Sequence, residues 1–258
     1  MKIAISGKGG SGKTTLVSLL AQGFRDSGRK VIAIDADSDS NLAVNLGFPP
    51  ETKITPLTEM HDLIHERTGV APGASTVFFT LNPRVDDIPD RFAAEHNGIR
   101  LMVMGTIRRG GSGCACPEHV IVKELLRHLF VEREEIVLLD TSAGIEHLSR
   151  GTAQYVDVLL VVVQATSASI QTFQRIKSMA SDLKIGTILV VANRVKSEAD
   201  LKRIREATGS EPIGIIPEND ALADYHGTEV DNNIHTAVAD LITRLDHLPV
   251  KDRNSKQG

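Results

Sequence analysis

Residues 7–14 read GKGGSGKT, and this octet decides the fold. It fits the pattern G-x-x-x-x-G-K-[ST], it follows the apolar residues 3–5, and it leads into a helical stretch. Glycines let the backbone curl so that successive N–H groups point inward, and the start of the following helix adds positive potential. The sequence therefore predicts a phosphate cradle built by Gly9, Gly10, Ser11 and Gly12.

The last two side chains of the octet and the residue after it predict the rest of a triphosphate site. Lys13 should neutralise the β- and γ-phosphate oxygens, and the Thr14 hydroxyl should ligate Mg²⁺. Thr15 should lie near the α-phosphate. We expect a nucleoside triphosphate and Mg²⁺ as the ligands of this loop.

The composition favours a parallel sheet covered by helices. Of the 258 residues, 41% are hydrophobic but only 3% are aromatic, so aliphatic side chains must build the core. Several apolar runs, such as VLLVVV at 158–163, are uninterrupted, as in strands buried on both faces. The predicted strands are 2–6, 30–35, 99–104, 136–140, 158–163, 187–192 and 211–215, and the predicted helices are 13–27, 58–67, 117–130, 168–182, 198–207 and 233–247.

This alternation predicts the α/β class: a doubly wound, mainly parallel sheet with helices on both faces, of the P-loop NTPase type. We expect residues 1–258 to form a single domain. Residues 48–89 are less regular and are predicted to be an insertion within it, and residues 251–258 a frayed tail.

Charge and hydropathy exclude several classes of protein. The net charge of −4 does not favour a general nucleic-acid binder. The apolar run 156–163 is interrupted by Asp157 and is too short to span a bilayer, and no signal peptide is visible at the start of the chain. We therefore expect a cytoplasmic protein with neither nucleic acid nor membrane as a partner.

Acidic residues follow two of the predicted strands, where a parallel sheet places its ligands. Four apolar residues precede Asp140, a Walker B pattern that predicts a carboxylate holding Mg²⁺ through water. The second strand ends in DADSDSN at 35–41, and of its carboxylates we expect Asp35 and Asp39 to be structural or hydrogen-bonding.

The two cysteines, Cys114 and Cys116, stand in a glycine-rich stretch just before Pro117, which is predicted to start a helix. A helix N-terminus lowers the pKa of a thiol and favours the thiolate. Two thiolates cannot complete a four-coordinate site, but two chains related by a two-fold axis would supply four. Zn²⁺ and Ni²⁺ both suit such a set, so the pair predicts a metal shared across a homodimer.

The loop with its second lysine, Lys8, resembles the deviant Walker A motif of the MinD/ParA/nitrogenase iron protein class. That resemblance implies that Lys8 reaches the nucleotide of a partner chain and that Asp37 orients the attacking water. It also implies an adenine contact by Asn193, with Pro217 and Glu218 on the other side of the base. Asn193-Arg194-Val195-Lys196 lacks the Asp of a guanine-specific motif, which favours ATP over GTP.

The deviant loop, the run DTSAGIEH at 140–147 and the Cys-Ala-Cys-Pro loop at 114–117 together resemble the CooC-type maturation ATPases of nickel-dependent carbon monoxide dehydrogenase. The resemblance extends over nearly the whole chain. It implies a homodimeric ATPase that binds nickel at its two-fold axis and helps insert it into the nickel–iron–sulfur cluster of the dehydrogenase. His119 and His147 are left without an assigned role.

Three other functions compete. A positioning ATPase of the MinD/ParA type would need a basic amphipathic tail or a DNA-binding patch, and neither the last helix nor Arg108 and Arg109 provide one. An iron–sulfur carrier is a closer alternative, although the adjacent cysteine pair does not match the separated cysteines of the nitrogenase iron protein. A nucleotide kinase is remote.

Overall fold

The computed structural model describes the chain except for residues 38–40, 71–78, 106–116, 143, 146–149, 224, 228–229 and 250–258. Its described residues form an eight-stranded sheet of order β3-β4-β2-β5-β1-β6-β7-β8. All neighbouring strands are parallel except β3 and β4, which are antiparallel. The strands are β1 (Lys2–Gly7), β2 (Val31–Ala36), β3 (Ala94–His96), β4 (Ile99–Val103), β5 (Ile136–Thr141), β6 (Val158–Val163), β7 (Ile188–Val195) and β8 (Gly214–Pro217).

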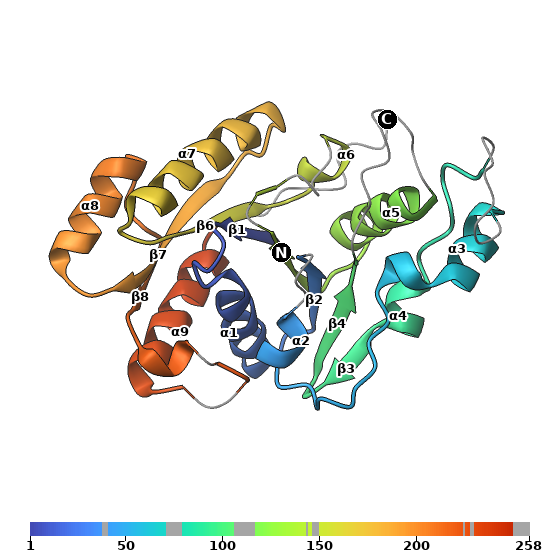
Figure 1. Cartoon of the computed structure of the whole chain (residues 1–258), viewed down its shortest axis with the longest axis horizontal. Coiled ribbons are helices and arrows are strands. Elements are labelled where there is room, and N and C mark those ends of the chain that lie inside the picture. Colours follow the sequence, from blue (N-terminus) through green and yellow to red (C-terminus); the bar gives the residue numbers. More distant parts are fainter. Residues whose placement is uncertain are drawn as a thin grey trace.

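Helices cover both faces of this sheet (Figure 1). One apolar cluster joins the sheet to α1 (Lys13–Asp26), α2 (Leu42–Asn45) and α9 (Asn232–Asp246). The other face packs on α3 (His61–Thr68), α4 (Ile88–Phe92), α5 (Pro117–Val131), α6 (Arg150–Ala153), α7 (Ser167–Asp182) and α8 (Glu198–Thr208). Because both faces are covered, β1, β2, β5 and β6 are buried at every position. The predicted doubly wound, mainly parallel fold is confirmed.

Side-chain caps fix where several helices begin. The Thr166 side chain accepts a hydrogen bond from the Ser169 N–H at the start of α7, and Ser197 and Asp231 do the same for α8 and α9. Pro117 opens α5, the position where its missing N–H costs no helical bond. The helices that follow these caps begin within one residue of the predicted starts.

Several elements differ from the prediction, and the short helices α2, α4 and α6 were not predicted. Strand β3 was not predicted: it pairs with β4 through a turn at Asn97 and Gly98, both at positive φ, which is a hairpin signal in the sequence. The predicted helix 58–67 is divided into a 3₁₀ turn, η1 (Leu57–Glu59), and α3, because Met60 has a non-helical ψ of 67°. The last strand lies at Gly214–Pro217, three residues beyond the predicted start.

Part of the predicted insertion is regular. Residues 57–68 hold η1 and α3, and Leu57, Leu63 and Ile64 are buried in the same cluster as α5. This packing follows from their apolar spacing. Within the described ranges no helix is both long and apolar enough to cross a membrane.

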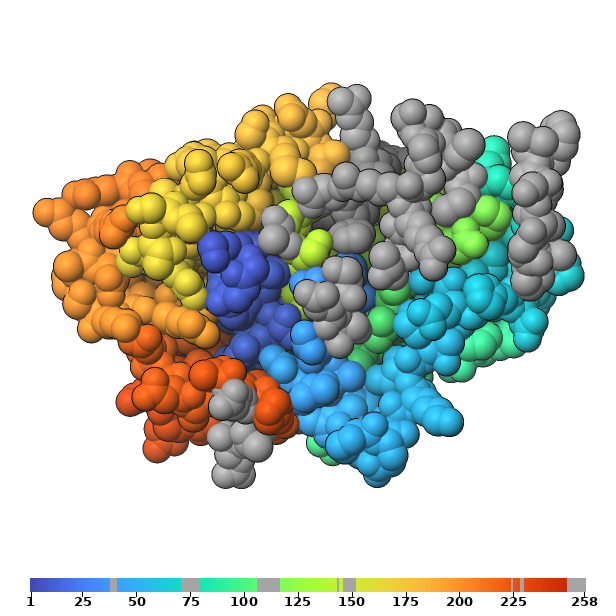
Figure 2. Space-filling model, viewed as in Figure 1, coloured from blue at the N-terminus to red at the C-terminus, as the bar shows by residue number. Residues whose placement is uncertain are grey.

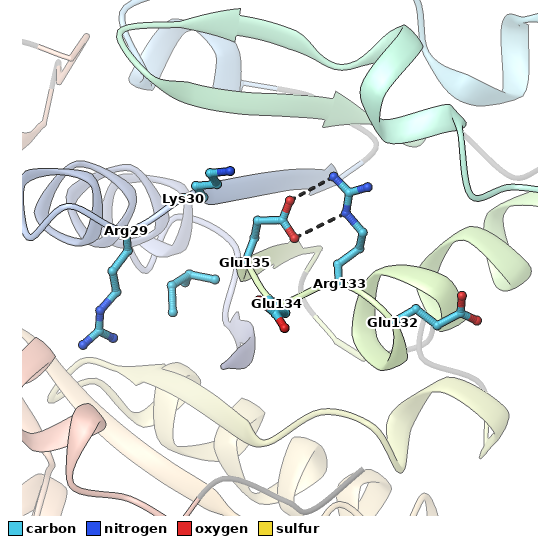
Figure 3. Close-up of a pocket in the computed structure, with 7 residues that line it drawn as sticks. Arg29, Lys30, Glu132, Arg133, Glu134 and Glu135 are labelled. Carbon is cyan, nitrogen blue, oxygen red and sulfur yellow. Dashed lines mark hydrogen bonds and ion pairs between the residues drawn. The ribbon is translucent and has the colours of Figure 1, made fainter. Parts of the chain in front are cut away.

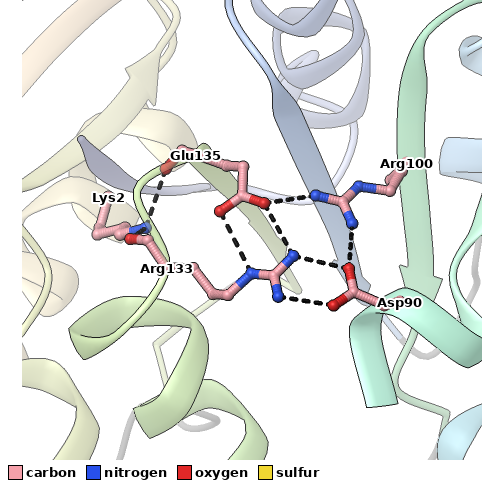
Figure 4. A network of polar contacts seen from close by, with 5 residues as sticks. All are labelled: Lys2, Asp90, Arg100, Arg133 and Glu135. Atoms are coloured by element: carbon pink, nitrogen blue, oxygen red, sulfur yellow. Dashed lines mark hydrogen bonds and ion pairs between the residues drawn. The ribbon is translucent and has the colours of Figure 1, made fainter. Parts of the chain in front are cut away.

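A polar network holds the amino ends of the strands (Figure 4). Arg133 contacts both Asp90 and Glu135, and Arg100 joins the same two carboxylates. The fully buried Lys2 donates from Nζ to the carbonyls of Arg133 (2.7 Å) and Glu135 (2.9 Å). An adjoining cavity of ≈ 460 Å³ carries basic and acidic side chains from the same loops (Figure 3). Because the two arginines and two carboxylates of the network pair with one another, they stabilise this end of the sheet.

Candidate functional site

The glycine loop joins β1 to α1 at the carboxyl edge of the sheet. Gly12 has φ 93°, and a Cβ built there would lie 2.3 Å from Asn193 Nδ2. Gly7 is equally constrained, because its Cβ would lie 2.6 Å from the Val162 carbonyl oxygen. The loop thus packs so closely on β6 and β7 that only glycine fits at these positions.

A cavity of ≈ 450 Å³ opens in front of this loop. Figure 2 shows the amino-terminal segment at the surface, between the orange-red carboxy-terminal elements and the light blue residues that follow β2. Besides part of the loop, the residues that line the cavity are Thr14, Thr15, Asp37, Asn41, Val44, Asn45, Arg194, Leu222, Ala223, Tyr225 and His226.

The two lysines of the loop have opposite environments. Lys13 is only 5% exposed and lines the cavity, whereas Lys8 is exposed and its Nζ lies 3.4 Å from the Gly9 carbonyl oxygen. Lys8 therefore lies on the surface, where a second molecule could meet it, while Lys13 faces the interior of its own chain.

Asn193 and Pro217 line a second, small cavity of ≈ 30 Å³ beside the loop. Its walls are mainly aliphatic, from Leu16, Leu19, Ile216 and Leu222, and Asn219 adds a polar group. Asn193 Nδ2 donates to the Ser11 carbonyl at 2.7 Å, so this side chain also braces the loop. The Glu218 side chain instead pairs with Lys196 at 2.8 Å and lines neither this cavity nor the larger one.

Arg194 lies at an irregular point of β7. It has φ 54°, and the pairing of β7 with β8 shifts register between Ala192 and Val195. Its position borders both cavities. A positive φ at a non-glycine residue is unfavourable and persists where the surrounding structure enforces it.

Asp140 ends the buried strand β5 and is 0% exposed. Burial raises the pKa of its carboxyl to about 7, and the charges of Asp35 and Asp37 act in the same direction, whereas Thr14 and Lys13 oppose the shift. No described group completes a hydrogen bond of good geometry to either carboxylate oxygen. A buried carboxylate with two free oxygens, beside the Thr14 hydroxyl, fits hydrated Mg²⁺.

A nucleotide fits the loop for a similar reason. The Ser11 hydroxyl is buried, and within the described part of the chain it has no hydrogen-bond partner. The Gly7 and Gly12 positions keep the backbone too close to its neighbours for side chains, as in the glycine-rich loops that cradle phosphates. The residues present therefore fit both ATP and Mg²⁺.

Gly144 follows β5 and is bonded to the strand that leads into the glycine loop. Its carbonyl accepts hydrogen bonds from the Ser6 hydroxyl (2.9 Å) and the Thr141 hydroxyl (2.8 Å). The segment after β5 is thereby tied to β1, the strand that leads into the glycine loop.

Several predicted residues fall outside the described part of the chain. These are Cys114, Cys116, Arg108, Arg109, Asp39 and His147. Among the described residues, no group of three or more His, Cys, Asp or Glu side chains could hold a metal ion. The described His119 is exposed in the first turn of α5.

Sequence reasoning missed Tyr225, His226 and Gln164. Gln164 follows β6 and its Nε2 lies 3.5 Å from the carbonyl oxygens of Gly10 and Ser11. A polar residue at the carboxyl end of a strand next to β1 was the available signal. Tyr225 and His226 follow a loop, and no local pattern placed them at the cavity.

Comparison with known proteins agrees with this geometry. Residues 2–230 match the family model "CobQ/CobB/MinD/ParA nucleotide binding domain". The carbon monoxide dehydrogenase accessory protein CooC of Rhodospirillum rubrum is 47% identical over 86% of this chain and 85% of its own. An uncharacterized ATP-binding protein of Methanocaldococcus jannaschii is 41% identical over 99% of this chain and 100% of its own.

A solved structure shows the same fold. The MinC:MinD cell division protein complex of Aquifex aeolicus contains a chain that superposes with a TM-score of 0.69 at 22% identity, over 97% of this chain and 98% of that one. The glycine loop, the buried Asp140 and these similarities agree, and the chain belongs to the MinD/ParA class of P-loop ATPases, within the family that includes CooC.

Proposed function

We propose that this chain is an ATP-dependent nickel metallochaperone that works as a homodimer in the maturation of carbon monoxide dehydrogenase. The ATPase part rests on one observation above all: the buried, unpartnered Asp140 carboxylate beside Thr14 and Lys13. The client is proposed from the 47% identity to CooC.

In this proposal the loop of one chain binds the nucleotide. The backbone N–H groups of residues 9–12 hold the phosphates, Lys13 neutralises the β- and γ-oxygens, and Thr15 lies near the α-phosphate. Thr14 and Asp140 hold Mg²⁺, Asp140 through water; bound Mg²⁺ supplies charge neutralisation at the β- and γ-phosphates. Asn193 and Pro217 contact adenine, whereas the Glu218 carboxylate pairs with Lys196.

Hydrolysis needs a positioned water and extra positive charge. Asp37, on the wall of the phosphate cavity, orients water for attack on the γ-phosphorus, and ADP leaves with the bridging oxygen. Lys8 acts on the partner chain's nucleotide, as an arginine finger does elsewhere, and its exposure supports that role. ATP would then hold two chains together.

Nickel is the cargo rather than a resident cofactor. Cys114 and Cys116 of two chains supply four thiolates, a set that also accepts Zn²⁺. Because both sites lie between the chains in this proposal, the nucleotide state changes how the four thiolates meet.

Metal binding by the Cys114→Ser variant tests the proposal. We expect purified wild-type protein to bind one Ni²⁺ per two chains in calorimetry, and Cys114→Ser to lose this binding while ATP hydrolysis stays measurable. His61→Ala, which removes an exposed imidazole from α3, is the matched control and should bind nickel normally. Unchanged nickel stoichiometry in Cys114→Ser, or sulfide-to-iron absorption bands after anaerobic purification, would reject the metallochaperone in favour of another carrier.

A further inference from the structure

Asp35 is the last carboxylate of β2 before the segment that carries Asp37. Its main chain is fixed on both sides, because β2 pairs with β4 and with β5 at this position. The Asp35 carbonyl also accepts the Met104 N–H at 2.8 Å. The side chain is 0% exposed. Asp35 is therefore a rigid point from which other groups can be held.

Each Asp35 oxygen accepts a main-chain hydrogen bond from the following segment. The Asp37 N–H donates to Oδ1 at 3.0 Å, and the Leu42 N–H donates to Oδ2 at 3.1 Å. One carboxylate thus binds the chain two residues and seven residues further on. A buried polar group that loses a hydrogen-bond partner costs free energy, so both bonds favour this arrangement of the Asp37 and Leu42 main chain.

The far end of this segment is anchored as well. Asn45 in α2 accepts a hydrogen bond from the Ser18 hydroxyl of α1 through its carbonyl. Between these anchors, Asp37, Asn41 and Val44 line the phosphate cavity. The described residues of this wall are thus held on one side by Asp35 and on the other by α1.

We propose that Asp35 is a positioning residue: by accepting hydrogen bonds from the Asp37 and Leu42 N–H groups, it sets where the Asp37 carboxylate lies relative to the phosphates. We call this pair of hydrogen bonds the clasp. This inference rests on the proposed function, in which Asp37 orients water. Asp35 itself is not among the residues that line the phosphate cavity. Its neighbour Asp140 has no such main-chain donors and is the carboxylate left for the ion.

Steady-state hydrolysis by Asp35→Asn tests these two hydrogen bonds, because the amide NH₂ that replaces one carboxylate oxygen can only donate. We expect kcat to fall roughly 10- to 100-fold, as small misplacements of a catalytic group do. The KM for ATP should change by less than about threefold, because the cradle is untouched. Asp35→Ser keeps a single acceptor oxygen and should likewise lower kcat while leaving the KM for ATP nearly unchanged.

A double-mutant cycle separates positioning from general damage. In an Asp37→Ala background, Asp35→Asn should reduce kcat no further, because the group that it positions is gone. Equal fractional losses in both backgrounds would overturn the proposal. So would a raised Mg²⁺ requirement of the kind expected for Asp140→Asn.

Hydrogen exchange gives a readout that does not depend on hydrolysis. The Leu42 amide should exchange faster in Asp35→Asn than in wild type, while amides of β5 stay protected. Unchanged Leu42 protection would overturn the clasp even if the wild type hydrolyses ATP as proposed. The opposite outcome is also distinguishable. If the wild type binds ATP but never hydrolyses it, and the Leu42 amide still exchanges faster in Asp35→Asn, the proposed function is rejected and the clasp is supported.

Discussion

Asp35 and Asp140 occupy register-matched positions on the neighbouring parallel strands β2 and β5, and both are fully buried. Asp35 accepts two main-chain N–H groups, whereas both Asp140 oxygens lack a partner among the described residues. Two carboxylates side by side in a dry interior repel each other, which is part of why the pKa of Asp140 rises to about 7. The division of donors between them leaves one carboxylate structural and the other available to a cation.

Asp140→Asn should raise the Mg²⁺ concentration needed for hydrolysis. A carboxylate that holds the ion through water acts as an outer-shell partner, and losing such a partner typically costs roughly 10- to 100-fold in metal affinity or activity. Titrating Mg²⁺ at saturating ATP measures the shift, with the exposed Asp182→Asn on α7 as the control. An unchanged half-saturating Mg²⁺ concentration would contradict the assignment of Asp140.

Gly12→Ala should destabilise the nucleotide-free protein by about 1–3 kcal/mol, because alanine at φ 93° is strained and its Cβ meets Asn193. Gly9→Ala is the matched control in the same loop, since a Cβ there would have no neighbour within 4 Å. Urea unfolding without nucleotide compares the two. Equal destabilisation by both substitutions would refute the close packing of Gly12 on β7.

Lys8→Ala should weaken dimerisation driven by ATP while a single chain still binds the nucleotide. The reason is that Lys8 is exposed and is proposed to contact the partner's nucleotide, whereas the buried Lys13 contacts the nucleotide of its own chain. Sedimentation with a slowly hydrolysed ATP analogue measures the dimer, and nucleotide fluorescence measures binding. The exposed Lys53→Ala should dimerise as wild type does; if Lys8→Ala does so too, the role across the interface is wrong.

The sequence predicted the glycine loop, Asp140 and most strand positions because each depends on a local pattern in a strand–helix context. It did not predict that the Glu218 side chain would pair with Lys196, since an ion pair between two loops has no periodic signal. It also missed the contribution of Tyr225 and His226 to the cavity, which depends on how a loop after β8 meets the turn after α2. Close contact between Gly47 and Gly227 brings those two segments together.

Asp90→Asn tests the network at the opposite end of the sheet. The Arg133 guanidinium lowers the pKa of Asp90 to about 2. A lowered pKa means that the stabilisation is complete above about pH 4, the usual unfolded value, and is lost as pH falls towards 2. Asp90 is half exposed, so we expect the substitution to cost no more than about 1 kcal/mol at pH 7.

Urea unfolding of wild type and Asp90→Asn at pH 7, 5, 4 and 3 checks this. The difference in the free energy of unfolding should be constant from pH 7 to 5 and should shrink below pH 4. The exposed Glu51→Gln is the control and should leave the unfolding curves unchanged. A difference that grows as the pH falls would have the wrong sign for a lowered pKa.

The central claim is that ATP and the cysteine pair act together to deliver nickel. The most direct measurement is the carbon monoxide oxidation activity gained by nickel-free dehydrogenase at limiting Ni²⁺, with and without this protein and ATP. We predict that activity rises with wild-type protein and ATP together, and that it does not rise with Cys114→Ser or Lys13→Ala. Equal activation without ATP, or by Cys114→Ser, would contradict the account.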